Sequence, residues 1–193
     1  DAFFDVHPGR ITKTILYTRS LERIYDAETL IKAMPIIRER VPEVRLIIAG
    51  SGSQEDFLGT LVRDTGMRDC ITFLGLVPSE KIPALMEQSS VFVSPALSDG
   101  TSIALMEAIA AGLTPVATDI DANRPMIRHG IDGLLFEPGN EKDLAHKIIS
   151  ALSGAIATDN LDNRRKEFMS RVSWSSVAGD FISLYKGLSQ GRT

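Results

Sequence analysis

The sequence has little cysteine, no long apolar run and no excess of positive charge. Cys70 is the one cysteine among 193 residues, which excludes an internal disulfide and a cysteine-based zinc cluster and is compatible with a reducing cytosol. The most apolar stretches, 46–49 and 91–93, are far shorter than the ~20 residues that a membrane-spanning helix needs. The formal net charge of −4 provides no basic face and argues against nucleic-acid binding.

Metal ligands and hydrolytic triads are also lacking. His7, His129 and His146 are scattered and show no metal-ligand spacing, and no Ser/His/Asp order supports a nucleophilic serine. We therefore predict no metal site and no serine-hydrolase chemistry.

What the sequence does contain is an alternation of short apolar runs with segments of helical periodicity. The strands are predicted at 11–18, 44–49, 71–74, 91–94, 115–118 and 133–136, and the helices at 27–41, 54–65, 80–88, 102–111, near 124–128 and at 141–152. Pro35 is expected to kink or shorten the first helix. The pattern predicts an α/β fold with a doubly wound, mainly parallel Rossmann-like sheet of about six strands, whose ligands bind beyond the carboxyl ends of the strands.

The composition changes after this alternation. A polar link at 153–160 leads into two helical stretches, at about 161–170 and 175–188, without a further strand. The chain starts at Asp1 and not at Met, which suggests a piece of a longer protein. We predict a linker at 1–10 from a missing N-terminal domain, a Rossmann-like domain at 11–153 and a helical C-terminal extension at 154–193.

The most informative segment is 94–115, SPALSDGTSIALMEAIAAGLTP. Asp99 and Gly100 form a turn signal, Thr101 or Ser102 can cap the helix that follows, and Glu107 lies within that helix. A helix N-terminus offers free backbone N–H groups and a positive dipole end to an anion. A phosphate-bearing ligand would meet this end, with the carboxylates close by to bind sugar or ribose hydroxyls.

This segment resembles the signature of the group 1 glycosyltransferases, a retaining nucleotide-sugar family with the two-domain GT-B fold. The family motif is a Glu, seven residues, then Glu-Ala; here Asp99 stands at the first Glu, and Glu107 with Ala108 at the second. The resemblance implies that the chain is the C-terminal, donor-binding domain. It also implies that Asp99 binds the sugar, Glu107 the ribose hydroxyls, and the backbone from Gly100 to Ser102 the diphosphate.

Arg19 follows the first strand, where the family has an arginine that faces the donor diphosphate. Guanidinium matches phosphate oxygens with two N–H groups. The family's lysine five residues further on is replaced by Ile24. Arg23, one residue away, is a candidate substitute. Arg19 is thus expected to act with Asp99 and Glu107 in catalysis, and Arg23 in donor binding.

Two further loops match the family. Gly50 and Gly52 begin like a dinucleotide fingerprint, but Glu55 replaces its third glycine. A tight strand-to-helix turn explains both glycines, whereas the resemblance places them beside the nucleotide. Leu76 and Val77, in the run FLGLV, correspond to a segment whose backbone faces the nucleotide base. Neither loop identifies the base.

The resemblance predicts sugar transfer of the hexosyltransferase type from a UDP-, GDP- or ADP-sugar to a glycan or lipid-linked acceptor, without a cofactor. The isolated chain is expected to be inactive, because the acceptor half is missing. The resemblance also implies that the C-terminal extension packs back toward the missing N-terminal domain. The alternatives are a GT-B sugar-nucleotide epimerase, a non-catalytic nucleotide-sugar-binding module and, least supported, a Rossmann dehydrogenase or methyltransferase. A cytoplasmic location is expected, with peripheral association at the inner membrane face left open for the full protein.

Overall fold

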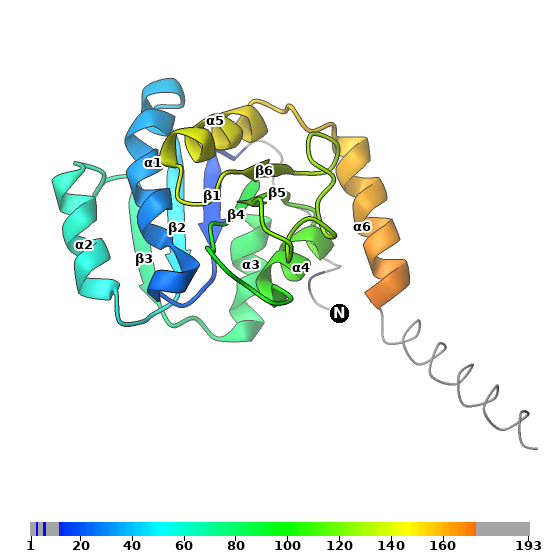
Figure 1. Cartoon of the computed structure of the whole chain (residues 1–193), viewed down its shortest axis with the longest axis horizontal. Helices are drawn as coiled ribbons and strands as arrows, with labels where there is room; N and C mark the ends of the chain where they lie inside the picture. The colour runs from blue at the N-terminus through cyan, green and yellow to red at the C-terminus, as the bar shows by residue number, and fades with distance from the viewer. Residues whose placement is uncertain (1–2, 4–5, 7–11, 173–193) are drawn as a thin grey trace, which may run out of the picture.

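The computed structural model describes residues 3, 6 and 12–172 and contains one parallel sheet (Figure 1). Its strands are β1 (Thr14–Tyr17), β2 (Arg45–Ala49), β3 (Ile71–Gly75), β4 (Val91–Ser94), β5 (Thr114–Thr118) and β6 (Leu134–Phe136). They lie in the order β3-β2-β1-β4-β5-β6. Every pairing is parallel, with Ile15 of β1 opposite Leu46 on one side and Val91 on the other.

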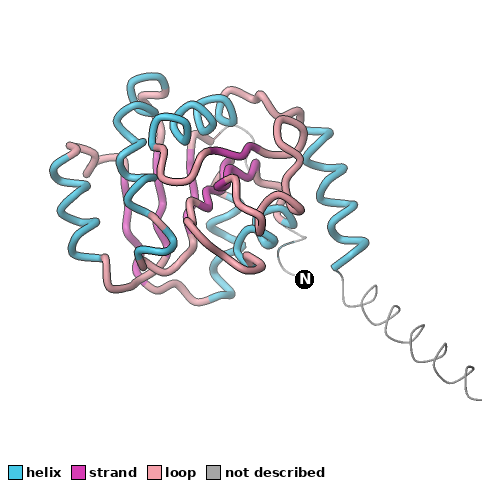
Figure 2. Tube along the Cα trace, viewed as in Figure 1, coloured by secondary structure: helices cyan, strands magenta, loops and turns pink. Residues whose placement is uncertain are grey.

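Helices cover both faces of the sheet, as a doubly wound fold requires (Figures 1 and 2). One face packs on α1 (Ala27–Arg40), α2 (Glu55–Asp64) and α5 (Glu141–Leu152), and the other on α3 (Ile82–Glu87) and α4 (Ile103–Ala110). Successive side chains of β1 alternate between them: Ile15 and Tyr17 belong to the first core and Leu16 to the second. The predicted α/β fold is confirmed.

Some element boundaries differ from the sequence-based prediction. The first strand is shorter than 11–18 and covers Thr14–Tyr17, although residue 11 is outside the described residues. Pro35 lies inside α1, which continues to Arg40 instead of ending early. The apolar side chains around the proline, Ile31, Met34 and Ile37, are fully buried, and this packing holds the helix across the missing hydrogen bond.

The helix predicted near 124–128 is wrong; the chain makes a series of turns there. Asn123 is buried, and its side-chain amide donates to the backbone oxygen of Thr118 at 2.9 Å. The backbone N–H groups of Asn123 and Met126 donate to Ile120 and Asn123, three residues back. The N–H groups of Arg124 and Ile127 donate four residues back, to the same two oxygens, each at 3.1 Å. These bonds form successive turns that do not continue into a helix.

The first helix of the predicted extension, α6, covers Thr158–Val172 and is longer at both ends than the stretch predicted at about 161–170. Arg164 of α6 donates from Nη2 to the backbone oxygen of Met126 at 2.8 Å, and its Nε lies 3.6 Å from Oδ2 of Asp132. The Asp132 side chain is fully buried and also pairs with Arg128 at 2.6 Å. Charges therefore fasten α6 to the loop between β5 and β6. The helix predicted at 175–188 lies outside the described residues, as does most of the predicted linker.

Candidate functional site

The candidate site lies at the carboxyl ends of β1 and β4, the two central strands. The strand order runs from β1 through β2 to β3 on one side and through β4 to β6 on the other. The loops after β1 and β4 therefore lead to opposite faces and leave a crevice between them, where ligands of doubly wound folds bind. Arg19 follows β1, and Asp99 and Ser102 follow β4.

Arg19 connects these two loops. Its Nη1 donates to Oγ of Ser102 at 2.8 Å, and its Nη2 lies 3.0 Å from Oδ2 of Asp99. The guanidinium carbon also lies 4.2 Å from the centre of the Tyr25 ring, a cation–π distance. The structure thus brings together three of the residues predicted from the sequence, Arg19, Asp99 and Ser102.

Ser102, and not Thr101, caps α4. Its buried Oγ accepts a hydrogen bond from the backbone N–H of Leu105 at 3.3 Å, as expected of an N-cap serine. Thr101 and Gly100 are exposed. The backbone N–H of Gly100 donates to Oδ1 of Asp99 at 2.9 Å. In this chain, the Asp99 carboxylate therefore uses a backbone donor that could also serve an anionic ligand.

Glu107 lies in α4, five residues after the cap, and is half-buried. Burial raises the pKa of its carboxyl group above the ordinary value. Other groups can relieve such a desolvation cost by donating hydrogen bonds to the carboxylate. Hydroxyl groups of a sugar or ribose have this chemistry.

Gly50 and Gly52 have a clear packing reason to be glycine. A Cβ on Gly50 would lie 2.1 Å from the backbone oxygen of Arg19, and one on Gly52 would lie 2.6 Å from that of Leu21. The two loops are also hydrogen-bonded, because the backbone N–H of Leu21 donates to Ser51 at 3.0 Å. Both glycines thus let the loop after β2 support the backbone that carries Arg19. Contact of either glycine with a ligand stays a prediction.

Leu76 and Val77 follow β3, where Leu76 is 83% exposed and Val77 is partly buried. Ile24, at the position of the family lysine, is exposed as well. Its backbone oxygen accepts a hydrogen bond from Leu97 at 2.9 Å, so the loops after β1 and β4 also meet here. The roles of Leu76 and Val77 in base binding stay predictions.

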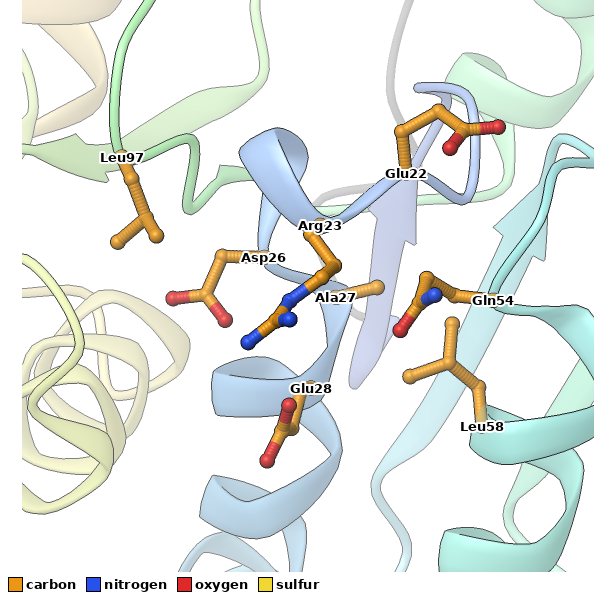
Figure 3. Close-up of a pocket in the computed structure, with 8 residues that line it drawn as sticks. All are labelled: Glu22, Arg23, Asp26, Ala27, Glu28, Gln54, Leu58 and Leu97. Carbon is orange, nitrogen blue, oxygen red and sulfur yellow. The ribbon is translucent and has the colours of Figure 1, made fainter.

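Arg23 lies at a different place from Arg19. It lines a pocket of about 100 Å³ together with the acidic side chains of Glu22, Asp26 and Glu28. Figure 3 shows its guanidinium pointing toward Asp26 and Glu28, whereas the Glu22 carboxylate points away from it. The lining of this pocket does not include Arg19, Asp99 or Ser102. Arg23 has acidic neighbours of its own, and its role in donor binding stays a prediction.

Sequence reasoning missed Tyr25. Its ring supports the Arg19 guanidinium, and Tyr25 itself ends a short 3₁₀ turn, Arg23–Tyr25, that follows the arginine. An aromatic residue six positions after an arginine is a weak signal, because the contact depends on how the turn folds back. The positive φ of 47° at Asp26, which ends this turn and caps α1, shows how tightly the chain reverses there.

The described part of the chain contains neither a metal-ligand cluster nor a membrane-spanning helix. No group of three or more His, Cys, Asp or Glu side chains there could hold a metal ion. No helix there is both long and apolar enough to cross a bilayer. The cytoplasmic location stays a prediction.

Comparison with known proteins identifies the family. Residues 7–168 match the family model described as glycosyl transferases group 1. An uncharacterized glycosyltransferase of Methanocaldococcus jannaschii is 31% identical over 175 residues, which are 90% of this chain and 45% of the relative. A phosphatidyl-myo-inositol mannosyltransferase of Mycobacterium leprae is 30% identical over 92% of this chain and 47% of its own length. The chain belongs to the group 1 glycosyltransferases, and it spans about half the length of these relatives.

Solved structures show the same fold. TarM of S. aureus, crystallised as a mutant with UDP among its ligands, superposes with a TM-score of 0.82 at 20% identity over 93% of this chain and 36% of TarM. HepE of Anabaena in complex with UDP-glucose gives 0.82 at 20% identity over 96% of this chain and 54% of HepE. The fold of the chain is that of the C-terminal domain of GT-B glycosyltransferases.

Proposed function

We propose that this chain is the donor-binding domain of a retaining glycosyltransferase that moves a sugar, of the hexosyl type, from a nucleotide-sugar to a glycan or lipid-linked acceptor. The proposal rests on one observation. Arg19, which follows β1, contacts both Asp99 and Ser102, which follow β4. The complexes of HepE with UDP-glucose and of TarM with UDP support a uridine nucleotide as the first donor to test.

In this proposal the site acts mainly on the leaving nucleoside diphosphate. Arg19 and the backbone N–H groups from Gly100 to Ser102 stabilise the negative charge that grows on the diphosphate as the bond to the sugar breaks. Preorganised donors of this kind each contribute a few kcal/mol to the transition state. Glu107 would bind the ribose hydroxyls, and Asp99 the sugar. The remaining half of the protein would supply most of the acceptor site.

Calorimetric titration of the chain with UDP-glucose, a GDP-sugar and an ADP-sugar tests the proposal. We expect weak binding of one of them, and an affinity about 30-fold lower in Arg19→Ala, since a hydrogen bond to a charged group contributes about 2 kcal/mol. Arg38→Ala is the matched control, because Arg38 pairs with Asp69 at the opposite end of the sheet. Failure of all three nucleotides to bind at millimolar concentration would contradict the proposal.

A non-catalytic nucleotide-sugar-binding module is the second candidate. It is favoured by Ile24 in place of the family lysine and by Asp99 in place of the longer glutamate. The first substitution removes a cation that would offset charge on the diphosphate, and the second shortens the side chain that would contact the sugar. Measurable sugar transfer by the full-length protein, lost in Arg19→Ala, would dismiss this candidate.

A further inference from the structure

We propose that Asp99 is a built-in competitor for the anion site, so that a diphosphate must displace the Asp99 carboxylate from Arg19 before it can bind. The inference rests on the proposed function and adds a step to it. The carboxylate of Asp99 contacts two of the groups that we assign to the diphosphate, the Arg19 guanidinium and the backbone N–H of Gly100. An anionic ligand and the Asp99 side chain therefore cannot both use these groups fully.

The burial of the Arg19 and Asp99 side chains strengthens this competition. The side chains of Arg19 and Asp99 are only 13% and 12% exposed, so water screens their attraction little. An arginine that lost its carboxylate at this depth would be a buried charge without a counter-charge, which is costly. Any ligand that takes the place of Asp99 must itself be anionic. This requirement selects phosphate-bearing ligands and disfavours neutral sugars.

The contacts also indicate which partner moves. Arg19 has two further supports, the Ser102 hydroxyl and the Tyr25 ring, and these stay in place when Asp99 leaves. Asp99 lies in an exposed loop next to Gly100, and its Oδ2 accepts no aligned hydrogen bond although Nη2 of Arg19 is 3.0 Å away. An ion pair without hydrogen-bond alignment is the weaker kind. We therefore expect Asp99 to swing out while Arg19 stays.

The exchange has a consequence for ligand choice. Once displaced, the Asp99 carboxylate lies close to an anionic ligand and needs new hydrogen-bond donors. The hydroxyl groups of an attached sugar can supply them, whereas inorganic pyrophosphate has no such groups. Asp99 should thus penalise a bare diphosphate more than a nucleotide-sugar.

The test is titration of inorganic pyrophosphate into the wild-type chain and into Asp99→Asn. We expect Asp99→Asn to bind pyrophosphate about 10-fold more tightly, a coupling of the size usual between competing sites. The double variant Arg19→Ala with Asp99→Asn should lose this gain. Asp69→Asn is the matched control, because it frees Arg38 of a carboxylate at the other end of the sheet and should leave binding unchanged.

Equal or weaker binding of pyrophosphate by Asp99→Asn would overturn the inference. If that occurs while the wild type binds a nucleotide-sugar through Arg19, the proposed function stands and only the competition fails. The reverse result, tighter pyrophosphate binding without binding of any nucleotide-sugar, keeps the competition and removes the proposed function.

A measurement on the wild type covers the case in which Asp99→Asn does not fold. The carboxyl ¹³C signal of Asp99 should shift as pyrophosphate is added, because the carboxylate leaves Arg19, whereas the signal of Asp69 should not. An Asp99 signal that stays still at saturating pyrophosphate would contradict displacement.

Discussion

At the scale of single residues, Gly50 leaves no room for a side chain next to the backbone of Arg19. We predict that Gly50→Ala lowers the free energy of unfolding by about 2 kcal/mol, because its Cβ would lie 2.1 Å from the backbone oxygen of Arg19. Gly59→Ala is the matched control. It lies inside α2 with nothing within 4 Å of the added Cβ, and should raise stability by up to about 1 kcal/mol. Urea denaturation measures both; equal effects would contradict the packing argument.

The raised pKa of Glu107 predicts how the stability of the chain depends on pH. Burial raises the pKa of Glu107, so the folded chain binds this proton more tightly than the unfolded chain does. The contribution of Glu107 to stability is therefore lost as the pH rises from 4.5, the ordinary value, through the raised pKa. Glu107→Gln should be more stable than the wild type at pH 7 and equally stable below pH ~4. Thermal unfolding across this range checks it, and a constant difference at all pH values would refute it.

Residue-level prediction from the sequence was limited by distance along the chain. The N-cap at Ser102 was among the expected candidates, because the serine and the helix it caps are neighbours in sequence. The ion pair of Arg19 with Asp99 was not predicted, because the residues follow different strands and meet only through the sheet order. The Arg19 contact with Tyr25 was missed because it depends on how the 3₁₀ turn that ends at Tyr25 folds back toward Arg19.

At the scale of elements, we predict that the attachment of α6 depends on the carboxylate of Asp132. Asp132→Asn should destabilise the chain by about 3 kcal/mol, because Arg164, with a side chain only 7% exposed, would lose its buried counter-charge. Asp121→Asn is the matched control: this carboxylate also pairs with an arginine, Arg124, but is 98% exposed and should contribute less than about 1 kcal/mol. Chemical denaturation compares the two, and hydrogen exchange should show α6 opening first in Asp132→Asn. Similar small effects would mean that charge does not hold α6.

Elements with one strong local signal were predicted well. The strands β4 and β5 are continuous buried runs and β2 is buried over most of its length. Asn140 caps α5, accepting from the backbone N–H of Asp143 at 3.0 Å. The segment 124–128 failed because its conformation is determined by the buried Asn123, which binds Thr118. A side chain that bonds to a neighbouring segment leaves no periodic trace in the sequence.

At the scale of the whole molecule, the sheet separates two cores that share its strands. We predict that Ile37→Ala in α1 and Leu105→Ala in α4 each cost about 3 kcal/mol, because both side chains are fully buried, one on each face. Their effects should add within about 0.5 kcal/mol, as for distant sites. Denaturation of the single and double variants, followed by circular dichroism and by NMR, should show one transition. Separate transitions for the two faces would contradict a shared sheet.

The sheet order also has a consequence for synthesis of the chain. The second edge of β1 stays unpaired until β4 is available. The ribosome makes β4 only after β2 and β3. Until then the apolar edge of β1 is open to other chains, and non-local pairings of this kind fold slowly. The same event brings Asp99 and Ser102 to Arg19. Assembly of the proposed anion site therefore requires that the two central strands have paired. A nascent chain would gain the ability to bind an anion there only after the open edge of β1 is covered.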